Sequence, residues 1–257
     1  MHWNDTAIVL SARKHGETSA IARVFTHERG VYAGVIRGIH SKANRGIVQP
    51  GNIVNAGWQA RLSEHIGTFK CELLEANAAH LMQDATRLAA LSSICTLIES
   101  ALPERHPYPK MYGALQAFLA TLRDSDDWPE ACVKLELSLL AEAGFGLDLS
   151  RCAATGATEN LIYVSPKSGR AVSRDAGEPY KEKLLKLPGF LLAKHSVQSP
   201  LPRSGEGTVR ASTAEILAGL RLTGYFLDHW LLSPHHRKLP AARGRLMEMM
   251  REFDVCT

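Results

Sequence analysis

The sequence predicts an α+β fold, with a small β-barrel at the N-terminus and an α-helical domain after it. Short β-rich stretches separated by glycines fill the first part of the chain. Apolar residues then recur at helical spacing, and small, turn-forming residues mark both edges of a compact insert. We therefore expect a barrel domain at residues 1–79, a helical domain at residues 80–257, and an insert at residues 148–180 within the helical domain.

Short strands account for the N-terminal region. Gly34 and Gly38 interrupt the third stretch, as expected where a strand of a small barrel bends sharply. Five strands with such bends suit an OB-type barrel, and an SH3-like barrel would give much the same pattern. The predicted strands span Thr6–Ala12, Ser19–Thr26, Val31–Ile39, Asn52–Leu62 and Thr68–Leu74.

Lysine and arginine occur in the turns between these strands. A loop with such cations can follow a phosphate backbone without reading its sequence, and glycines let the loop approach a phosphate closely. Trp58 offers a face on which a base can stack, and a place in the barrel core is the alternative. The candidate DNA-binding residues are Arg13, Lys14, Arg29, Arg37, Lys42, Arg45 and Trp58, and for the cations a solvated turn without a ligand is the alternative.

The charge is distributed unevenly along the chain. The net charge is +4 overall, with +5 over residues 1–70, −6 over residues 71–180 and +5 over residues 181–257. Two basic ends around an acidic middle are directly explained by binding to a polyanion such as nucleic acid. A basic surface that serves an acidic protein partner, without direct DNA function, is the alternative.

Apolar periodicity predicts four main helices. Pro129 suits the first turn of the third helix, and Ser212 with Glu215 forms a capping box at the start of the fourth. On the third helix, Glu136 and Glu142 are expected on the solvent-exposed face. The main helices are predicted at residues 81–102, 110–122, 130–143 and 212–232, with a shorter helix at 181–190 and an irregular segment at 196–207.

The insert has the shape of a zinc ribbon, in which Leu161–Val164 is a short strand between two knuckle-like turns. A zinc ribbon places a metal ligand at four positions, which here hold Cys152, Thr155, Ser173 and Ala176. Structural zinc needs four N, S or O ligands, so most of the metal ligands are lost and no bound metal is expected. The knuckle is expected to be held by turn hydrogen bonds from Thr155 and Ser173.

The sequence gives no indication of an enzyme, a membrane protein or a secreted protein. It contains no GxxxxGK[ST], HExxH or GxSxG motif, so we expect no catalytic residues and no cofactor. We also expect no membrane span and no signal peptide. Five cysteines without a CxxC pair are typical of reduced thiols in the cytoplasm.

Several motifs resemble the RecO family of recombination and repair mediators. An apolar strand at residues 7–10 leads into RKHGETS at residues 13–19, and a second strand ends in FTHERG at residues 25–30. Arg37-Gly38 follows in the next basic turn, and HHRKLPAAR lies at residues 235–243. Together with the insert, these motifs touch both ends and the middle, so the resemblance covers nearly the whole chain.

The resemblance implies an OB-fold for the barrel and a non-catalytic role in DNA recombination. Proteins of this family bind single- and double-stranded DNA, anneal complementary strands and, with RecR, help to load RecA on DNA coated by single-strand-binding protein. The family also has a pocket for the acidic, apolar C-terminal tail of the single-strand-binding protein. We expect that pocket around Lys134 and Leu137, with Lys238 or Arg243 facing the tail carboxylates. The resemblance further implies a cytoplasmic protein associated with the bacterial nucleoid, without membrane contact.

Overall fold

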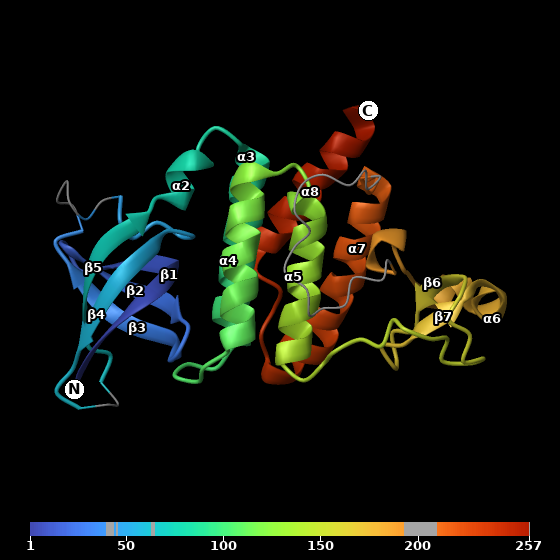
Figure 1. Ribbon diagram of the computed structural model, residues 1–257, viewed down its shortest axis with the longest axis horizontal. Coiled ribbons are helices and arrows are strands. Elements are labelled where there is room, and N and C mark those ends of the chain that lie inside the picture. The colour runs from blue at the N-terminus through green and yellow to red at the C-terminus, as the bar shows by residue number, and fades with distance from the viewer. Residues whose placement is uncertain (40–43, 45, 63–64, 193–209, 257) are drawn as a thin grey trace. The chain divides into compact units, whose positions relative to one another are not determined.

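The computed structural model describes residues 1–39, 44, 46–62, 65–192 and 210–256. The chain divides into two compact units, Met1–Asp124 and Ser125–Thr257. The first unit holds a β-barrel and the helices that follow it, and the second holds a helical bundle and a small sheet (Figure 1). This confirms the predicted α+β fold. Among the described residues, no helix is long and apolar enough to cross a membrane.

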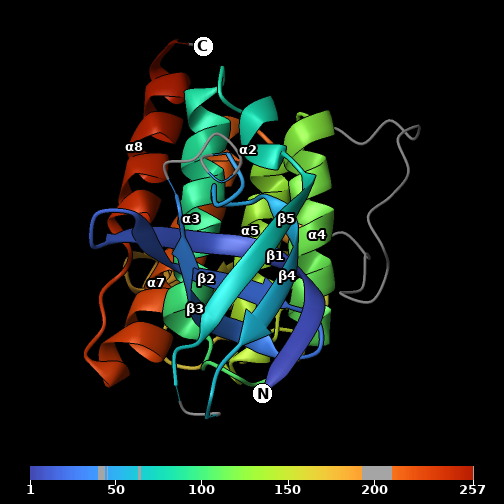
Figure 2. The ribbon, with the colours of Figure 1, turned by 90° about the vertical axis from the view of Figure 1, so that its left-hand side faces the viewer.

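The barrel of the first unit is formed by β1 (His2–His15), β2 (Ser19–Thr26), β3 (Gly30–Arg37), β4 (Ile53–Gln59) and β5 (Thr68–Glu75). The order around the ring is β1-β2-β3-β5-β4. Neighbouring strands are antiparallel except β3 and β5, which run parallel and close the ring through Val35 and Thr68. Figure 2 shows the strands crossing at steep angles, as the closure of a small barrel requires. The arrangement agrees with the predicted OB-type barrel.

β1 is longer than the predicted strand at both ends. Its first residues pair with β4, from His2 opposite Gln59 to Ile8 opposite Ile53, and its last residues pair with β2. Polar residues predominate in these outer parts, so they carry no apolar signal from which a strand is predicted. A register shift between Val9 and Ser11 lets the long strand bend from one partner to the other.

The interior of the barrel is filled by inward-pointing side chains from all five strands, including Trp58 and Phe69. Two glycines make room for these rings. A Cβ on Gly34 would lie 2.5 Å from the ring of Phe69, and a Cβ on Gly67 would lie 2.5 Å from the ring of Trp58. Gly67 also has a φ of 66°, which only glycine adopts readily, so both packing and backbone conformation require glycine there.

One side of the barrel faces helices of the same unit, α2 (Asn77–His80), α3 (Ala85–Ala101) and α4 (Pro109–Asp124), with α3 packed against β1 and α4 packed against α2 and α3. Ile8, Leu10 and Phe25 are buried on this side, outside the barrel's own core cluster. Tyr112 of α4 contacts Phe25, with ring centroids 5.6 Å apart. The helices therefore cover apolar surface that the barrel alone would expose to water.

α3 begins later than the predicted helix. Asp84 is its N-cap, since the carboxylate accepts hydrogen bonds from the backbone N–H groups of Thr86 and Arg87. The preceding residues form a turn after the short helix α2, although their apolar spacing resembles that of a helix. α4 agrees with the predicted helix at residues 110–122 to within two residues at each end.

The second unit is built on α5 (Trp128–Glu142), α7 (Thr213–Phe226) and α8 (Ala241–Cys256), with α7 in contact with both of the others. The predicted capping box of α7 is confirmed. The hydroxyl of Ser212 accepts from the N–H of Glu215, and the carboxylate of Glu215 accepts from the N–H of Ser212. After α7 the helix changes form, to a π-helix η3 (Leu227–Leu232) and then a 3-10 turn η4 (Ser233–His235).

Glu136 of α5 is completely buried, so its predicted position on the solvent-exposed face is wrong. It forms a bidentate ion pair with Arg243 of α8, at 3.1 Å from Nε to Oε1 and 3.0 Å from Nη2 to Oε2. Thr223 of α7 also donates a hydrogen bond to this carboxylate. The partner lies 107 residues away in the sequence, so nothing local distinguishes this glutamate from a solvated one.

Two strands of the insert and one strand beyond its predicted end form a three-stranded sheet, in which β6 (Leu161–Val164) lies between β7 (Ala171–Ser173) and β8 (Leu185–Lys186). β6 is the predicted strand. A short helix α6 (Arg174–Gly177) and 3-10 helices η1 (Glu178–Lys183) and η2 (Gly189–Leu191) complete this region. The predicted helix at residues 181–190 is therefore wrong, because Leu185 and Lys186 pair with β6 and Pro188 and Gly189 follow directly. The irregular segment predicted at residues 196–207 lies outside the described residues.

Candidate nucleic-acid interface

The strand register separates the predicted DNA-binding cations into two groups. Lys14 is paired opposite Ala20 and Ser19 opposite Arg37, so Lys14 and Arg37 lie near the β1–β2 turn. Arg29 lies in the β2–β3 turn, at the other end of β2. With a rise of about 3.3 Å per residue along β2, the two turns are roughly 20 Å apart. The predicted Lys42 and Arg45 lie outside the described residues.

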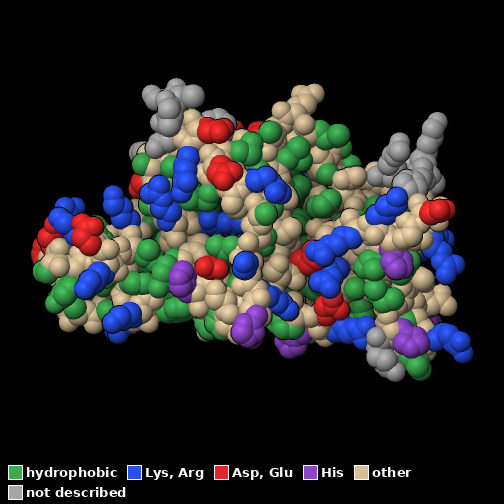
Figure 3. Space-filling view, turned by 180° about the vertical axis from the view of Figure 1, so that it is seen from behind, with side chains coloured by type: hydrophobic (Ala, Val, Ile, Leu, Met, Phe, Trp, Pro, Cys, Tyr) green, Lys and Arg blue, Asp and Glu red, His purple; other side chains and the backbone are tan. Residues whose placement is uncertain are grey.

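Arg13, Lys14 and Arg37 define what we call the basic end of the barrel, where all three side chains are exposed. Arg13 donates to Glu99 of α3 at 3.0 Å, although its side chain is 77% exposed. Arg23 also pairs with Glu99, at 3.6 Å. Figure 3 shows Lys and Arg side chains intermixed with Asp and Glu over the barrel, at the right of the view. Glu99 offsets part of the charge of Arg13, so Lys14 and Arg37 are the stronger candidates for phosphate contact.

Trp58 does not have the position predicted for a base-stacking residue. It is 2% exposed and belongs to the core cluster of the barrel. Its indole N–H donates to the carbonyl oxygens of Ala33 at 3.2 Å and Ile66 at 3.1 Å, which fixes the orientation of the ring. The alternative weighed from the sequence, a core position, is the one that the structure shows.

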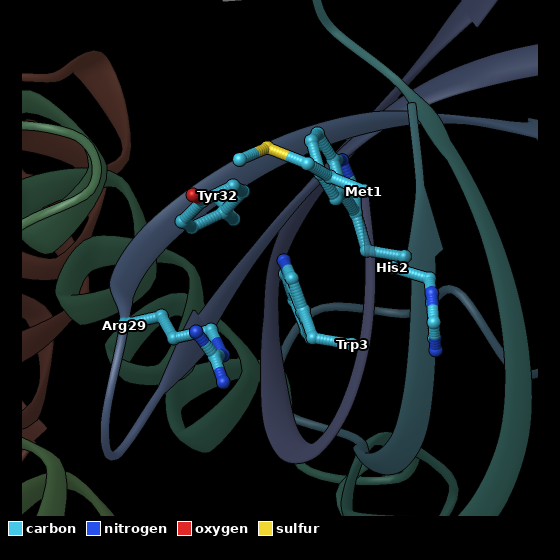
Figure 4. A pocket seen from close by; sticks show the side chains of 6 residues that line it. Met1, His2, Trp3, Arg29 and Tyr32 are labelled. Atoms are coloured by element: carbon cyan, nitrogen blue, oxygen red, sulfur yellow. The ribbon is translucent and has the colours of Figure 1, made fainter. Parts of the chain in front are cut away.

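An aromatic pocket of about 480 Å³ opens at the barrel end that carries Arg29. The ring of Trp3 stacks on that of Trp58 with centroids 5.9 Å apart, and Tyr32 stands edge-on to Trp3 at 5.1 Å. Figure 4 shows Trp3, Tyr32 and Arg29 facing the same hollow from different directions. We call this hollow the Trp3 pocket; it is lined by Met1, His2, Trp3, Arg29, Tyr32 and Trp58.

Two arginines lie over the aromatic rings of this region. The guanidinium carbon of Arg29 is 5.3 Å from the ring centroid of Trp3, and that of Arg105 is 5.3 Å from the ring centroid of Tyr32. Both distances are those of cation–π contacts. Arg105 also donates to the carbonyl oxygen of His65 at 3.2 Å. The pocket region therefore combines flat aromatic faces with fixed positive charge, which suits an aromatic anion.

Trp3, Tyr32 and Arg105 were not among the predicted site residues. Trp3 and Ala7 are an even number of residues apart on β1, so they lie on the same face of the strand. Because Ala7 is a core residue, this alternation could have placed the Trp3 ring at the barrel interior. Arg105 carries no comparable signal. It follows α3 in a proline-containing connection, and only the tertiary fold brings it to Tyr32.

The predicted partner-binding residues of the second unit differ in exposure. Lys134 is exposed on α5, 3.7 Å from Glu130 and 5.8 Å from the ring centroid of Phe190. Leu137, on the same helix, is half-buried, and Lys238 is exposed. Arg243 is only 4% exposed. Its charge is already neutralised by Glu136, so the prediction that it faces a partner's carboxylates is wrong.

The knuckle of the insert is organised around one sulfur atom. Cys152 is buried, and its thiol accepts from the N–H of Ser173 at 3.3 Å and from the Ser173 hydroxyl at 3.4 Å. Burial acts to raise the pKa of Cys152, but hydrogen bonds from Ser173 and Thr155 outweigh it and lower the pKa to about 6. In the part of the chain that the structure describes, no three His, Cys, Asp or Glu side chains are grouped to hold a metal ion.

Comparison with known proteins accounts for both parts of the chain. Residues 1–77 match the family described as "Recombination protein O N terminal", and residues 82–240 match "Recombination protein O C terminal". The chain belongs to the RecO family. The RecO N-terminal segment ends within the first unit, at the start of α2, and the RecO C-terminal segment begins shortly before α3. The basic end and the Trp3 pocket thus lie mainly in the RecO N-terminal segment.

Individual RecO relatives are similar over nearly their whole length. "DNA repair protein RecO" of Rhodospirillum centenum is 48% identical over 254 residues, which cover 98% of this chain and 96% of the relative. The protein of the same name in Rhodospirillum rubrum is 43% identical over 260 residues, covering 99% and 98%. That of Bartonella quintana is 44% identical over 250 residues, covering 97% of both chains. The resemblance found in the sequence is confirmed.

Proposed function

We propose that this RecO-family chain acts in DNA repair and recombination as a non-catalytic DNA-binding mediator. It anneals complementary strands and, together with RecR, helps to load RecA on DNA coated by single-strand-binding protein. Such a mediator holds DNA strands and a protein partner at the same time, which requires binding surfaces and no covalent step. Membership of the RecO family supports the role in repair.

The basic end of the barrel is the observation that carries the DNA-binding proposal. Lys14 and Arg37 are exposed and come from strands that are neighbours of β2 on opposite sides. Cations placed in this way neutralise phosphates without contact to base edges, so binding is independent of sequence. Neutralised phosphates repel each other less, and this favours the approach of two complementary strands.

The exposed side of α5 is the proposed contact for the acidic, apolar tail of single-strand-binding protein. Lys134 supplies a charge beside the ring of Phe190, and Leu137 supplies apolar surface on the same helix. Lys238 is the further cation proposed to face the tail. Contact with this tail would bring the mediator to coated DNA, in the cytoplasm and at the nucleoid.

The proposal is tested by measuring binding and annealing of complementary single strands across a salt series. The variant Lys14→Ala/Arg37→Ala is compared with Lys110→Ala/Lys183→Ala, which removes two exposed lysines elsewhere. Each lost phosphate contact lowers the slope of log K against log salt by about 0.7 for single strands, so the first variant should lose about 1.4. The control variant should keep the slope and the annealing rate of the wild type.

The outcomes separate three explanations. A smaller salt dependence of DNA binding and slower annealing in Lys14→Ala/Arg37→Ala, but not in the control variant, would support the basic end as the DNA surface. An equal decrease of the salt slope and of the annealing rate in both variants would mean that only the total charge matters. The assignment of DNA binding to the basic end would then be wrong. If neither variant nor the wild type binds DNA, the chain is an assembly module for an acidic protein. The tail contact is measured separately with an acidic, apolar peptide, whose affinity should fall in Lys134→Ala and stay unchanged in Lys183→Ala.

A further inference from the structure

The Trp3 pocket lies apart from the basic end, and its chemistry is different. The basic end offers exposed cations alone, whereas the pocket combines the ring of Trp3, the ring of Tyr32 and the guanidinium of Arg29 in one hollow. Its volume of about 480 Å³ falls within the range of about 300–1,000 Å³ that is usual for small-molecule sites. It can therefore accept one flat group of moderate size.

The walls of the pocket are held in place by the barrel. The N–H of Trp58 is bonded to two carbonyl oxygens, and Trp3 stacks on Trp58 at an interplanar angle of 16°. Tyr32 stands edge-on to Trp58 as well, with centroids 5.3 Å apart. Gly67 leaves the room that the Trp58 ring needs, as described above. A ligand that enters this pocket therefore meets preformed aromatic walls, and it stacks on Trp3 when the Arg29 guanidinium, which lies over that ring, moves aside.

Two residues that line the pocket, Trp3 and Arg29, carry unsatisfied donors. The indole nitrogen of Trp3 and the Nε of Arg29 are buried, and neither has a hydrogen-bond partner among the described residues. Nearly all buried polar atoms in proteins are paired, so two unpaired N–H groups beside one hollow indicate that an acceptor from outside completes them. Trp and Arg side chains only donate, so the missing group must present acceptor atoms.

These requirements together define the ligand. It must have a flat face for the aromatic rings, acceptor atoms at its edge for the N–H groups, and negative charge nearby for Arg29. A nucleobase with its phosphate has all three properties. Phenylalanine and tryptophan side chains have the flat face but no acceptor at the ring edge, tyrosine has an acceptor there but no negative charge, and an aliphatic carboxylate has acceptors but no flat face. The chemistry of the pocket therefore favours a nucleotide over a peptide.

We propose that the Trp3 pocket binds one unstacked base of a single-stranded nucleic acid, with the adjoining phosphate on Arg29. This inference rests on the proposed DNA-binding function and adds to it a second contact, roughly 20 Å from the basic end along β2. Stacking on an aromatic ring accepts any base, so the pocket favours single strands over duplexes without selecting a sequence. A base in a duplex is paired and stacked and cannot enter.

The test compares three probes with the full chain, which carries any affinity tag at its C-terminus because Met1 and His2 line the pocket. The probes are a thymidine oligomer, an abasic oligomer of the same length and charge, and a duplex. The wild type should bind the thymidine oligomer about tenfold more tightly than the abasic one. Trp3→Leu should bind both oligomers with the affinity that the wild type has for the abasic probe. Tyr180→Leu, which removes an exposed ring in the second unit, should behave as the wild type.

A cross-linking measurement on the wild type tests the pocket without a substitution, in case Trp3→Leu impairs folding. A 5-bromouracil oligomer should cross-link to the peptides that contain Trp3 or Tyr32, and cross-links at other peptides alone would overturn the proposal. Equal wild-type affinity for the thymidine and abasic oligomers would also overturn it. In both cases a loss of binding in Lys14→Ala/Arg37→Ala would leave the proposed function standing. If an acidic aromatic peptide binds the wild type and not Trp3→Leu, while the oligomers do not distinguish the two proteins, the pocket belongs to a protein partner instead.

Discussion

Glu136 and Arg243 form an ion pair that is almost completely removed from water, with side chains 0% and 5% exposed. Burial acts to lower the pKa of Arg243, and attraction to the Glu136 carboxylate outweighs it and raises the pKa. Arg243 also donates to the carbonyl oxygen of Leu220 on α7. One guanidinium thus joins α8 to α5 and α7, and the arginine has a structural role in place of the predicted contact with a partner.

Replacement of Arg243 should strongly destabilise the second unit. In Arg243→Met the carboxylate of Glu136 stays buried without a counter-charge, which costs about 3–5 kcal/mol. Urea denaturation followed by far-UV circular dichroism measures this loss. The double variant Glu136→Leu/Arg243→Met removes both charges and should recover most of the stability. A double variant no more stable than Arg243→Met would show that the pair is not what the arginine stabilises.

Cys152 should make the stability of the insert depend on pH. Its pKa of about 6 lies below the ordinary value of 9.0, so the folded state favours the thiolate relative to the unfolded state. This contribution is fully present above pH 9 and is lost as the pH falls through about 6. The difference in melting temperature between wild type and Cys152→Ala should therefore grow from pH 6 to pH 9. A difference that stays constant over this range would contradict the lowered pKa.

At the scale of single elements, the capping box of α7 should make a measurable contribution. Ser212→Ala removes the acceptor of the Glu215 N–H and should cost about 1 kcal/mol. Ser212→Asp keeps an acceptor at the N-cap and should lie within a few tenths of a kcal/mol of the wild type. Equilibrium unfolding in urea compares the three proteins. Equal losses in both variants would mean that the hydroxyl has another role than capping.

Elements with strong local signals were predictable from the sequence. The core of each barrel strand and the start of α7 follow from β-rich stretches and from a cap motif, and both agree with the structure. The wrong predictions concern residues whose environment is set by distant parts of the chain. Glu136 is buried because Arg243 reaches it, and Arg105 joins the aromatic region because α3 packs on the barrel. The segment at 181–190 is not a helix because Leu185 and Lys186 pair with β6, about 20 residues earlier in the chain, and Pro188 follows.

At the scale of the molecule, the predicted domain boundary at residue 79 follows the end of the barrel strands. We propose that the barrel needs the helices up to Asp124 in order to fold independently of the second unit. Ile8, Leu10 and Phe25 are buried outside the barrel's own core, and a fragment of residues 1–79 would expose them. A fragment of residues 1–124 should melt cooperatively and stay monomeric, whereas 1–79 should aggregate or melt at a lower temperature. Thermal denaturation and size-exclusion chromatography decide this, and two fragments of equal stability would refute it.

The ring of the barrel is not equally strong all the way round. The pairing of β1 with β2 and the pairing of β4 with β5 each extend along most of the strand. β3, by contrast, pairs with β5 at Val35 and Thr68. The N–H of Val35 also donates to the carbonyl oxygen of Gly67, so the join is a short clasp at one end of β5. A barrel closed by so short a pairing between β3 and β5 resembles a curved sheet whose two edge strands are in contact. Local opening of the barrel should therefore start where β3 meets β5. In a native-state hydrogen-exchange measurement, the amide of Val35 should exchange with deuterium before the amides of β1.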